Sequence, residues 1–518
     1  MIKSVEIKLI PSEASDEHLI LQKAVKKAKV RVERVKSCQV HRRSIDARQK
    51  QVYFRLLVNL HLDETPEAAP ALLANLETVT KAEKVIIVGA GPAGYFAALE
   101  LIELGLKPII FDRGKDVRLR RRDLKAIQQD GIVDGDSNYC FGEGGAGTYS
   151  DGKLYTRSHK RGNIEKVLRL LVEHGAKSDI LVDAHPHIGS NKLPNIVANI
   201  RATIEAFGGE IHFGAKVTDF LTEKGRMQGV VVNGAQTHRA AAVILATGHS
   251  ARDIYQLLVD KKISVEAKPF ALGVRIEHPQ RLIDEVQYRQ PQREEALPAA
   301  SYRLACQVEG RGVFSFCMCP GGLIVPAATA PGEIVVNGMS MSRRDSAFAN
   351  AGTVVAVEAE DLVGYEQFGV FAGLEFQKSV ESAMFAFGDG SQKAPGQRLT
   401  DFAQGKLSAS LGDTSYIPGL LSAPLHELLP PLIAKRLRVG VREFGKKMKG
   451  YYTKEAMVIG AESRTSSPIR IPRNKSHLMH NEMIGLFPCG EGAGFAGGIL
   501  SAAMDGQNVA RAVRNFFE

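Results

Sequence analysis

The chain has 518 residues, of which 44% are apolar and 24% are charged, and its net charge is +10. This composition is typical of a folded globular protein, and the length favours roughly three domains. No run of about 18 apolar residues occurs, charges interrupt the apolar pattern of the first residues, and the six cysteines lack framework spacing. These features disfavour a membrane span, an export signal and a secreted disulfide scaffold, so we expect a cytoplasmic protein.

Residues 1–81 form a basic module ahead of the first glycine motif. Alternating patterns at 3–10, 30–40 and 52–62 predict strands and the pattern at 18–28 predicts a helix, which together give a small α+β unit of βαββ order. A short helix or linker follows. The segment from Lys23 to Arg55 has twelve bases against two acids, so it carries the whole surplus of positive charge. These bases indicate either a solvated face or a surface for an acidic protein, an anionic substrate or RNA. Few aromatic residues lie among them, which weakens the RNA interpretation.

Residues 84–94 read KVIIVGAGPAG, an apolar run that enters a glycine turn and continues as a predicted helix. Gly89 allows the tight turn, Gly91 lets the backbone approach a pyrophosphate, and Gly94 lets the helix pack on its strand. Asp112 ends the second predicted strand, about 20 residues further on, where an acid commonly binds the adenosine ribose. The motif predicts a dinucleotide site but does not distinguish NAD from FAD.

Further along, the predicted elements are the exposed charged segment 116–125, helices at 163–175 and 191–207, a hairpin within 210–232 and a buried strand at 241–245. Five glycines within 141–154 indicate backbone pressed against a flat object. The strand at 241–245 ends in a small-residue turn at Thr247 and Gly248, where a ligand at the edge of a sheet would lie. His185 and His187 lack a third ligand at a recognisable spacing, so no metal site is predicted.

Residues 264–457 have longer mixed segments and are interpreted as an inserted substrate or cap domain, which ends in a long basic helical stretch. The last residues return to the first pattern, with a strand at 484–488, a glycine turn at 489–494 and a final helix at 497–517. The N-terminus of that helix could offer N–H groups and a positive dipole end to an anionic ring.

The glycine motif with Asp112, the turn at 246–248 and the turn at 489–491 resemble, in this order, the two-domain FAD flavoproteins of the glutathione-reductase type. Residues 141–154, 317–322 and 490–506 more closely resemble the bacterial FAD-dependent dehydrogenase, or NAD(P)/FAD-dependent oxidoreductase, family that has an extra N-terminal domain. The resemblance implies an α/β fold with a Rossmann-like FAD-binding domain at 82–262 and 456–518. It also implies an inserted α+β substrate/cap domain at 263–455, preceded by the α+β module at 1–81.

The same resemblance implies FAD contacts along the chain. It puts Gly89, Gly91 and Gly94 at the pyrophosphate, Asp112 at the ribose, the Val217 backbone near adenine and Glu491 at the ribityl or phosphate part. The other expected cofactor residues flank these or line the flavin: Pro92, Ala93, Arg113, Gly114, Gly145, Gly147, Ser150, Gly152, Lys153, Thr247, Gly248, Gly490, Gly497, Gly498 and Ile499. No second glycine fingerprint follows a strand, so electrons come from a transiently docked NADH or NADPH, from a protein donor or from the substrate.

The catalytic candidates are Cys317, Cys319 and His187. One intervening residue can hold two sulfurs close together, and a thiolate of low pKa could exchange electrons with a flavin. The competing interpretation is two small buried cysteines in a strand. Our first hypothesis is an FAD-dependent oxidoreductase acting on a small organic substrate, and the second is a flavoprotein recruited to RNA or an acidic macromolecule. A third, a lipid-directed reductase like the geranylgeranyl reductases, rests on analogy of fold.

Overall fold

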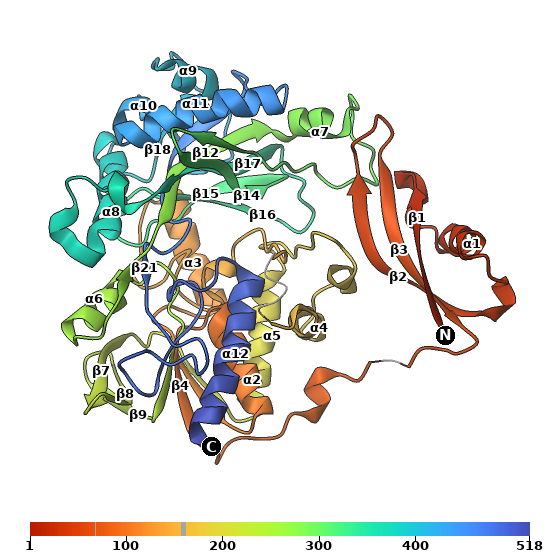
Figure 1. The fold of residues 1–518 in the computed structure, drawn as a ribbon. Helices are drawn as coiled ribbons and strands as arrows, with labels where there is room; N and C mark the ends of the chain where they lie inside the picture. The colour runs from red at the N-terminus through yellow and green to blue at the C-terminus, as the bar shows by residue number, and fades with distance from the viewer. Residues whose placement is uncertain (68, 157–161) are drawn as a thin grey trace.

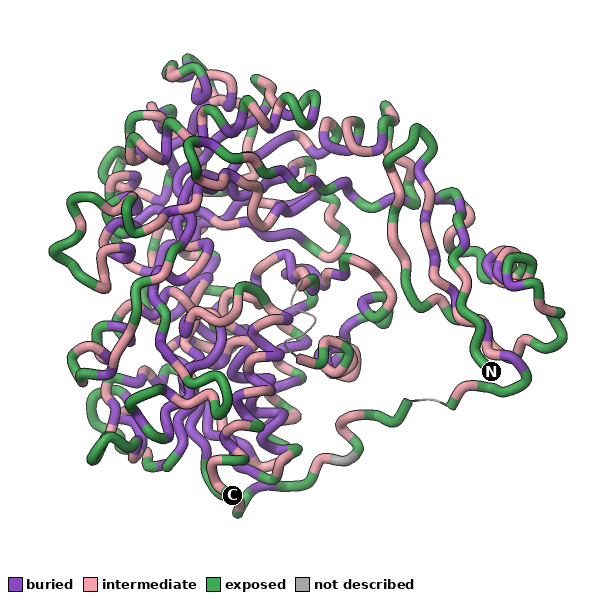
Figure 2. The backbone as a smooth tube through the Cα atoms, in the orientation of Figure 1, coloured by how far each residue is buried: buried purple, intermediate pink, exposed green. Residues whose placement is uncertain are grey.

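The computed structural model describes residues 1–67, 69–156 and 162–518. Figure 1 shows a small N-terminal unit beside a body in which two larger sheets lie one above the other. Buried residues concentrate in these two sheets and in the helices packed on them (Figure 2). Within the described parts of the chain, none of the helices combines the length and apolar character that crossing a lipid bilayer requires.

The N-terminal module has the order β1 (Ile2–Leu9), α1 (Glu17–Ala28), β2 (Val35–Asp46) and β3 (Tyr53–Leu62). Its antiparallel sheet has the strand order β1-β3-β2. Every second residue of β3 is buried, because α1 packs on one face of the sheet while the other face stays partly open. Residues 32–34 form a 3-10 turn, so the second strand begins at Val35 and not at 30 as its alternation predicted.

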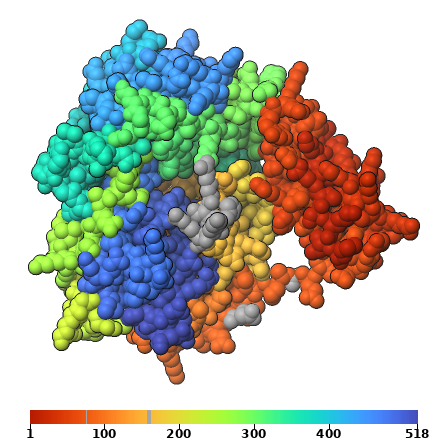
Figure 3. Space-filling view, in the orientation of Figure 1, coloured from red at the N-terminus to blue at the C-terminus, as the bar shows by residue number. Residues whose placement is uncertain are grey.

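One edge of this module is attached to the body. The backbone of Arg43 on β2 exchanges hydrogen bonds with Val182 (2.8 Å) and Ala184 (2.9 Å), and its guanidinium Nε lies 2.7 Å from a carboxylate oxygen of Asp183. The connecting segment contains the 3-10 helix η3 (Leu72–Asn75). Figure 3 shows the module meeting the body at one end and standing apart from it elsewhere.

The first large sheet is parallel throughout, with the order β22-β10-β4-β5-β6. Its strands are β4 (Lys84–Val88), β5 (Lys107–Phe111), β6 (Glu210–His212), β10 (Ala242–Leu245) and β22 (Leu486–Pro488). The nearly continuous apolar runs of β4 and β10 suit strands that are covered on both faces. One face carries α2 (Pro92–Glu103), α4 (Ile164–Glu173), α5 (Leu193–Ala206) and α12 (Ile499–Phe517).

The opposite face carries a three-stranded antiparallel sheet and α6 (Arg252–Asp260). Its strands are β7 (Val217–Glu223), β8 (Arg226–Val232) and β9 (Gln236–Arg239). The hairpin predicted within 210–232 is therefore present only from Val217 onward. Residues 210–212 pair with β5 instead, because the chain turns at Gly214, whose φ is +61°. The charged segment predicted at 116–125 forms the N-cap and first part of helix α3 (Val117–Gln129).

The second large sheet has seven mostly antiparallel strands in the order β13-β14-β17-β12-β20-β18-β19. Their bounds are β12 (Phe270–Pro279), β13 (Ala305–Val308), β14 (Arg311–Cys319), β17 (Phe348–Val357), β18 (Ala394–Arg398), β19 (Leu420–Ser422) and β20 (Met457–Glu462). Strand β20 follows the predicted domain boundary at 455/456, yet it pairs with β12 and β18. This sheet therefore extends past that boundary.

The remaining elements complete this upper half of the body. They are α7 (Gln280–Tyr288), α8 (Ala372–Phe387), α9 (Leu399–Gln404), α10 (Leu425–Leu428), α11 (Pro431–Lys447) and the pairs β15 (Gly322–Pro326) with β16 (Val336–Ser340) and β11 (Glu266–Ala267) with β21 (Ile469–Arg470). Further 3-10 helices are Pro11–Glu13, Gly145–Gly147, Ser178–Leu181, Ala359–Asp361 and Glu366–Phe371. The long helix α11 packs across strands of the second sheet.

Candidate functional site

A cavity of about 370 Å³ lies where the carboxyl ends of β4 and β10 face the second sheet. Its walls on this side include the turn after β4, the turn after β10, the glycine-rich segment 145–153, the turn after β22 and the start of α12. Strands β14, β16 and β20 close the opposite side with residues 316–317, 337–338 and 462. Ligands of open parallel sheets bind at this carboxyl edge, so the cavity is the candidate site.

The turn after β4 requires glycine at two positions. Gly89 has φ +108°, and a Cβ there would lie 2.4 Å from the carbonyl oxygen of Ala246. A Cβ on Gly94 would lie 2.0 Å from the carbonyl oxygen of Gly89, which shows how closely α2 packs on its own turn. Gly91 is the N-cap of α2 and no side chain caps this helix end. The first N–H groups of α2 therefore begin at the cavity wall, where an anion would satisfy them.

The start of α12 offers a second such helix end at the same cavity. Gly498 is its N-cap, no side chain caps it, and Gly497, Gly498 and Ile499 line the cavity. A Cβ built on Gly248, Gly497 or Gly498 would meet no protein atom within 4 Å. These glycines leave room for a ligand beside the backbone. Two helix N-termini and a glycine-lined wall fit a flavin dinucleotide, whose pyrophosphate and ring both favour positive dipole ends.

Asp112 lies at the end of β5 and is buried. Its carboxylate accepts hydrogen bonds from the backbone N–H groups of Ala90 and Gly114, both at 2.9 Å. Each oxygen keeps a further lone pair, so the carboxylate can still accept from a ribose hydroxyl. Beside it a smaller cavity of about 40 Å³ is lined by Arg113, Val217 and Thr247, among others. Asp112 is expected to bind the ribose, and this smaller cavity extends the candidate site beyond it.

The predicted cofactor residues fall into three groups. Those that line the main cavity are Gly89, Gly91, Pro92, Ala93, Asp112, Gly145, Gly147, Ser150, Gly152, Lys153, Thr247, Gly248, Glu491, Gly497, Gly498 and Ile499. Arg113 and Val217 line the smaller cavity. In the described structure Gly94, Gly114 and Gly490 line neither. They allow close packing, since a Cβ on Gly490 would lie 2.9 Å from Ala93 Cβ and one on Gly114 would lie 2.5 Å from Gly142.

The substrate side of the cavity is dominated by a bulge in β14. The pairing of β14 with β17 shifts between Phe316 and Cys319, and Cys317 within the bulge has φ +45°. Such conformations cost free energy in residues other than glycine and concentrate at functional sites. Cys317 lines the cavity, whereas Cys319 is fully buried. The Nζ of Lys153 lies 3.8 Å from the sulfur of Cys317 and 3.6 Å from that of Cys319.

The two cysteines differ in acidity. A hydrogen bond from Cys319 lowers the pKa of Cys317 well below that of an ordinary thiol, and the charges of Lys153 and Arg275 act in the same direction against burial. The same hydrogen bond, together with burial, raises the pKa of Cys319. Of the two thiols, Cys317 is therefore the one that ionises more readily, and it is also the one that lines the cavity.

Lys153 is positioned by its own neighbours. Its charge faces Asp151, 3.7 Å away, and Asp151 also pairs with Arg344 at 2.5 Å. Although burial raises the pKa of Asp151, the charges of Lys153 and Arg344 outweigh it and hold the value at about 2. His187 forms a backbone bridge with Lys153, and its ring Nε2 lies 3.1 Å from the carbonyl oxygen of Ser342. His187 is not among the residues that the structure places on the cavity wall, so its position fits support of Lys153.

Glu462, at the end of β20, is a cavity residue that the sequence reasoning missed. Its carboxylate lies 3.2 Å from the Nε of the fully buried Arg275. Burial raises its pKa to about 7, and this effect exceeds the opposing charge of Arg275. A carboxyl group that titrates near neutrality at a cavity wall can accept or donate a proton. The available signal was a glutamate that ends an otherwise apolar strand.

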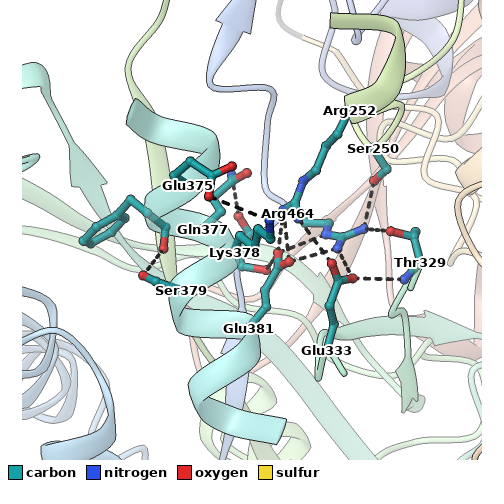
Figure 4. A network of polar contacts seen from close by, with 12 residues as sticks. Ser250, Arg252, Thr329, Glu333, Glu375, Gln377, Lys378, Ser379, Glu381 and Arg464 are labelled. Atoms are coloured by element: carbon teal, nitrogen blue, oxygen red, sulfur yellow. Dashed lines mark hydrogen bonds and ion pairs between the residues drawn. The ribbon is translucent and has the colours of Figure 1, made fainter. Parts of the chain in front are cut away.

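A buried charge network fixes the wall next to Glu462. Figure 4 shows Arg464 between Glu381 and Glu333. Ser250 and Arg252 approach it from the part of the chain that packs on the parallel sheet. The guanidinium of Arg464 donates to Glu333 at 2.7 Å and to Glu381 at 2.9 Å. Arg252, at the start of α6, donates to the same Glu381 at 3.0 Å. The network links the parallel-sheet unit to the second sheet across the cavity and leaves its carboxylates paired.

Outside this cavity, ion pairs occupy part of the basic surface of the N-terminal module. Five of its bases meet carboxylates: Lys23 with Glu13, Arg34 with Asp63, Arg43 with Asp183, Arg48 with Asp46 and Arg55 with Glu6. The local surplus of positive charge is therefore partly neutralised. Over the described residues, no group of three or more His, Cys, Asp and Glu side chains has the arrangement of a metal site.

Comparisons with solved structures give only weak likenesses. CtdE in complex with FAD is 12% identical, with 83% of this chain and 84% of that chain covered and a TM-score of 0.34. FqzB is 14% identical, with 85% and 78% covered and a TM-score of 0.35. A geranylgeranyl bacteriochlorophyll reductase-like protein from Thermoplasma acidophilum is 13% identical, with 84% and 79% covered and a TM-score of 0.33. TM-scores this low carry no argument about fold or function.

Sequence comparisons are more informative. Residues 269–465 match the family model "FAD-dependent protein, C-terminal domain-like", and residues 1–61 match a domain of unknown function, DUF8436. The first match spans all strands of the second sheet and supports FAD as the cofactor. An "Uncharacterized protein" from Clostridium beijerinckii is 40% identical over 535 residues, with 99% of both chains covered. This chain belongs to the same family as that Clostridium beijerinckii protein.

Proposed function

We propose that this protein is an FAD-dependent oxidoreductase that binds its flavin in the main cavity and acts on a small organic substrate. The observation that carries the proposal is the meeting of two uncapped helix N-termini and open glycines at the carboxyl edge of one parallel sheet. The match of residues 269–465 to a domain of FAD-dependent proteins supports it independently.

In this proposal the chain holds the dinucleotide along its length. The turn at Gly89 and the start of α2 bind the pyrophosphate, Asp112 binds the ribose, and the smaller cavity at Val217 takes the adenine. The segment 145–153 and the start of α12 border the flavin ring, and Glu491 lies toward the ribityl chain. When bound, FAD supplies two-electron transfer at its ring.

The residues on the opposite wall handle protons and position the substrate. Glu462 exchanges a proton near neutral pH, and Arg275 holds its carboxylate in place at 3.2 Å. The network around Arg464 fixes the distance between the two walls. Cys317 presents its sulfur to the same space, and the nearby charge of Lys153 favours its ionised form. The finer assignment, a cytoplasmic dehydrogenase of the glutathione-reductase type, is part of this proposal.

The test is the visible spectrum of the purified protein, followed by anaerobic addition of NADH or NADPH. We expect the absorption of a bound flavin. Bleaching by a reduced nicotinamide would show a transient nicotinamide donor, and a flavin that stays oxidised would indicate a substrate-fed dehydrogenase or a protein donor. Protein that is folded but neither contains flavin nor takes it up would overturn the proposal.

Recruitment to RNA or an acidic partner through residues 1–81 stays a prediction. The pairing of five of the twelve bases with carboxylates does not favour it. Binding of RNA that weakens steeply as salt is raised would revive it.

A further inference from the structure

The bulge in β14 brings two sulfurs together at the wall of the main cavity. Residues two apart in a strand lie on the same side, and the left-handed conformation of Cys317 turns the chain locally between them. The sulfur of Cys319 approaches the carbonyl oxygen of Cys317 at 3.3 Å. Both sulfurs contact the single ammonium group of Lys153, at 3.8 and 3.6 Å. The arrangement holds two sulfurs side by side over one positive charge.

The two positions differ in access to the cavity. Cys317 is part of the wall, whereas Cys319 is fully buried behind it. Reagents in the cavity therefore reach Cys317 first, and Cys319 can act only on the sulfur of Cys317. This division matches that of an attacking and a resolving cysteine in thiol–disulfide exchange.

We propose that Cys317 and Cys319 form a redox-active dithiol that closes into a disulfide at the cavity wall, which makes thiols and disulfides the substrate class of this protein. The inference rests on the proposed function, because oxidised FAD is the acceptor of the electron pair. A structural pair of buried cysteines needs neither the strained bulge nor a cationic contact shared by both sulfurs.

In closure, the S–H bond of Cys319 breaks and the Cys317–Cys319 bond forms, which releases two electrons and one proton. Oxidised FAD takes both electrons and that proton, so charge and atoms balance. With a disulfide substrate the direction of electron transfer is reversed, and the cysteine pair reduces the substrate. Cys317 displaces one thiol of the substrate, Cys319 then displaces the second and loses its proton, and reduced FAD reopens the protein disulfide.

The experiment is mass mapping of the FAD-loaded protein after anaerobic equilibration with reduced or oxidised glutathione. Cleavage after Arg311 and Arg343 gives one peptide that contains Cys317 and Cys319 and no other cysteine. In reduced glutathione we expect this peptide to take two alkyl labels. In oxidised glutathione we expect it to lose two hydrogens and take no label. A peptide that keeps two labels in oxidised glutathione would overturn the proposal.

Two variants separate the roles of the cysteines. In Cys319→Ser we expect Cys317 to retain glutathione as a mixed disulfide, because no second sulfur can displace it. In Cys317→Ser we expect Cys319 to stay unmodified. Cys306→Ser, on strand β13, is the matched control and should behave as the wild type. Equal retention of glutathione by the wild type and Cys319→Ser would contradict the resolving role.

The same mapping on flavin-free protein distinguishes the two proposals. A disulfide that closes with oxidised glutathione in protein unable to bind FAD would overturn the proposed function, and with it FAD as the electron acceptor, but would leave thiol–disulfide exchange by the cysteine pair standing. A flavin that binds while both thiols stay open would overturn the dithiol alone.

Discussion

The two walls of the cavity are built on different principles. The wall formed by the parallel sheet consists of backbone: glycine turns at 89–94 and 497–498 and the first N–H groups of two helices. The wall formed by the second sheet consists of side chains, with Cys317 and Glu462 as its titratable members, and Lys153 reaches Cys317 from the segment 145–153. Backbone recognition needs glycine at fixed local spacing, whereas the side-chain wall is assembled from strands far apart in sequence. One wall of the cavity thus binds through its backbone, and the opposite wall supplies the side chains for chemistry.

The wall formed by the parallel sheet is most sensitive to substitution at Gly89. In Gly89→Ala the new Cβ meets the carbonyl oxygen of Ala246 at 2.4 Å, and φ +108° is unfavourable for alanine. We expect a loss of more than about 3 kcal/mol, shared between folding and FAD binding. Flavin titration and thermal unfolding measure the two parts.

Gly105→Ala, at φ +75° with open space around it, is the control for backbone strain alone. It should retain wild-type affinity for FAD. Equal losses of FAD affinity in both variants would contradict a specific role for the turn after β4.

Glu462→Gln tests the opposite wall. Burial raises the pKa of Glu462 from 4.5 to about 7, so the folded protein keeps a proton that the unfolded chain releases. This group therefore favours folding below pH 4.5, and its contribution is lost as the pH rises through 7, at a cost of about 3 kcal/mol.

The glutamine variant lacks this titration, so its free energy of unfolding relative to wild type should rise by about 3 kcal/mol from pH 4.5 to 8. Denaturant unfolding at both pH values checks it. Parallel pH profiles of the two proteins would show that Glu462 has an ordinary pKa.

Asp112→Asn tests the assignment of Asp112 to the ribose, and we expect a smaller loss of free energy than in the two variants above. The side chain keeps its size but has one acceptor oxygen in place of two, so the hydrogen bonds with Ala90 and Gly114 cannot both persist. We expect FAD affinity to fall about tenfold, corresponding to about 1.4 kcal/mol. Calorimetric titration of FAD measures it, and unchanged affinity would remove Asp112 from the site.

Lys153→Met gives the smallest effect and concerns the thiolate alone. Loss of the ammonium group should raise the pKa of Cys317, because an opposite charge near both sulfurs is removed. The pH dependence of alkylation at Cys317 by iodoacetamide reports this change. Lys261→Met, whose ammonium pairs with Asp219, serves as the control. An unchanged alkylation profile in Lys153→Met would separate Lys153 from the acidity of Cys317.

The difference between the walls also explains what the sequence could predict. The strand, turn and helix around Gly89 were predictable because each step depends on neighbours in the chain. The proximity of Cys317 to Cys319 was suggested by their spacing, but the bulge and the Lys153 contact depend on pairing between β14 and β17. Glu462 was missed, because its raised pKa comes from burial in the folded protein, and its ion-pair partner Arg275 lies on another strand. The predicted domain boundary at 455/456 missed β20 because this strand pairs with β12 and β18, which lie far from it in sequence.

The most direct test of the account is the stoichiometry with which flavin-stripped protein takes up FAD, measured by calorimetric titration. We predict about one FAD per chain for the wild type and for Glu462→Gln, and a strongly weakened uptake for Gly89→Ala. No uptake by folded wild-type protein, or equal uptake by Gly89→Ala, would contradict the claim that the glycine wall of this cavity holds the flavin.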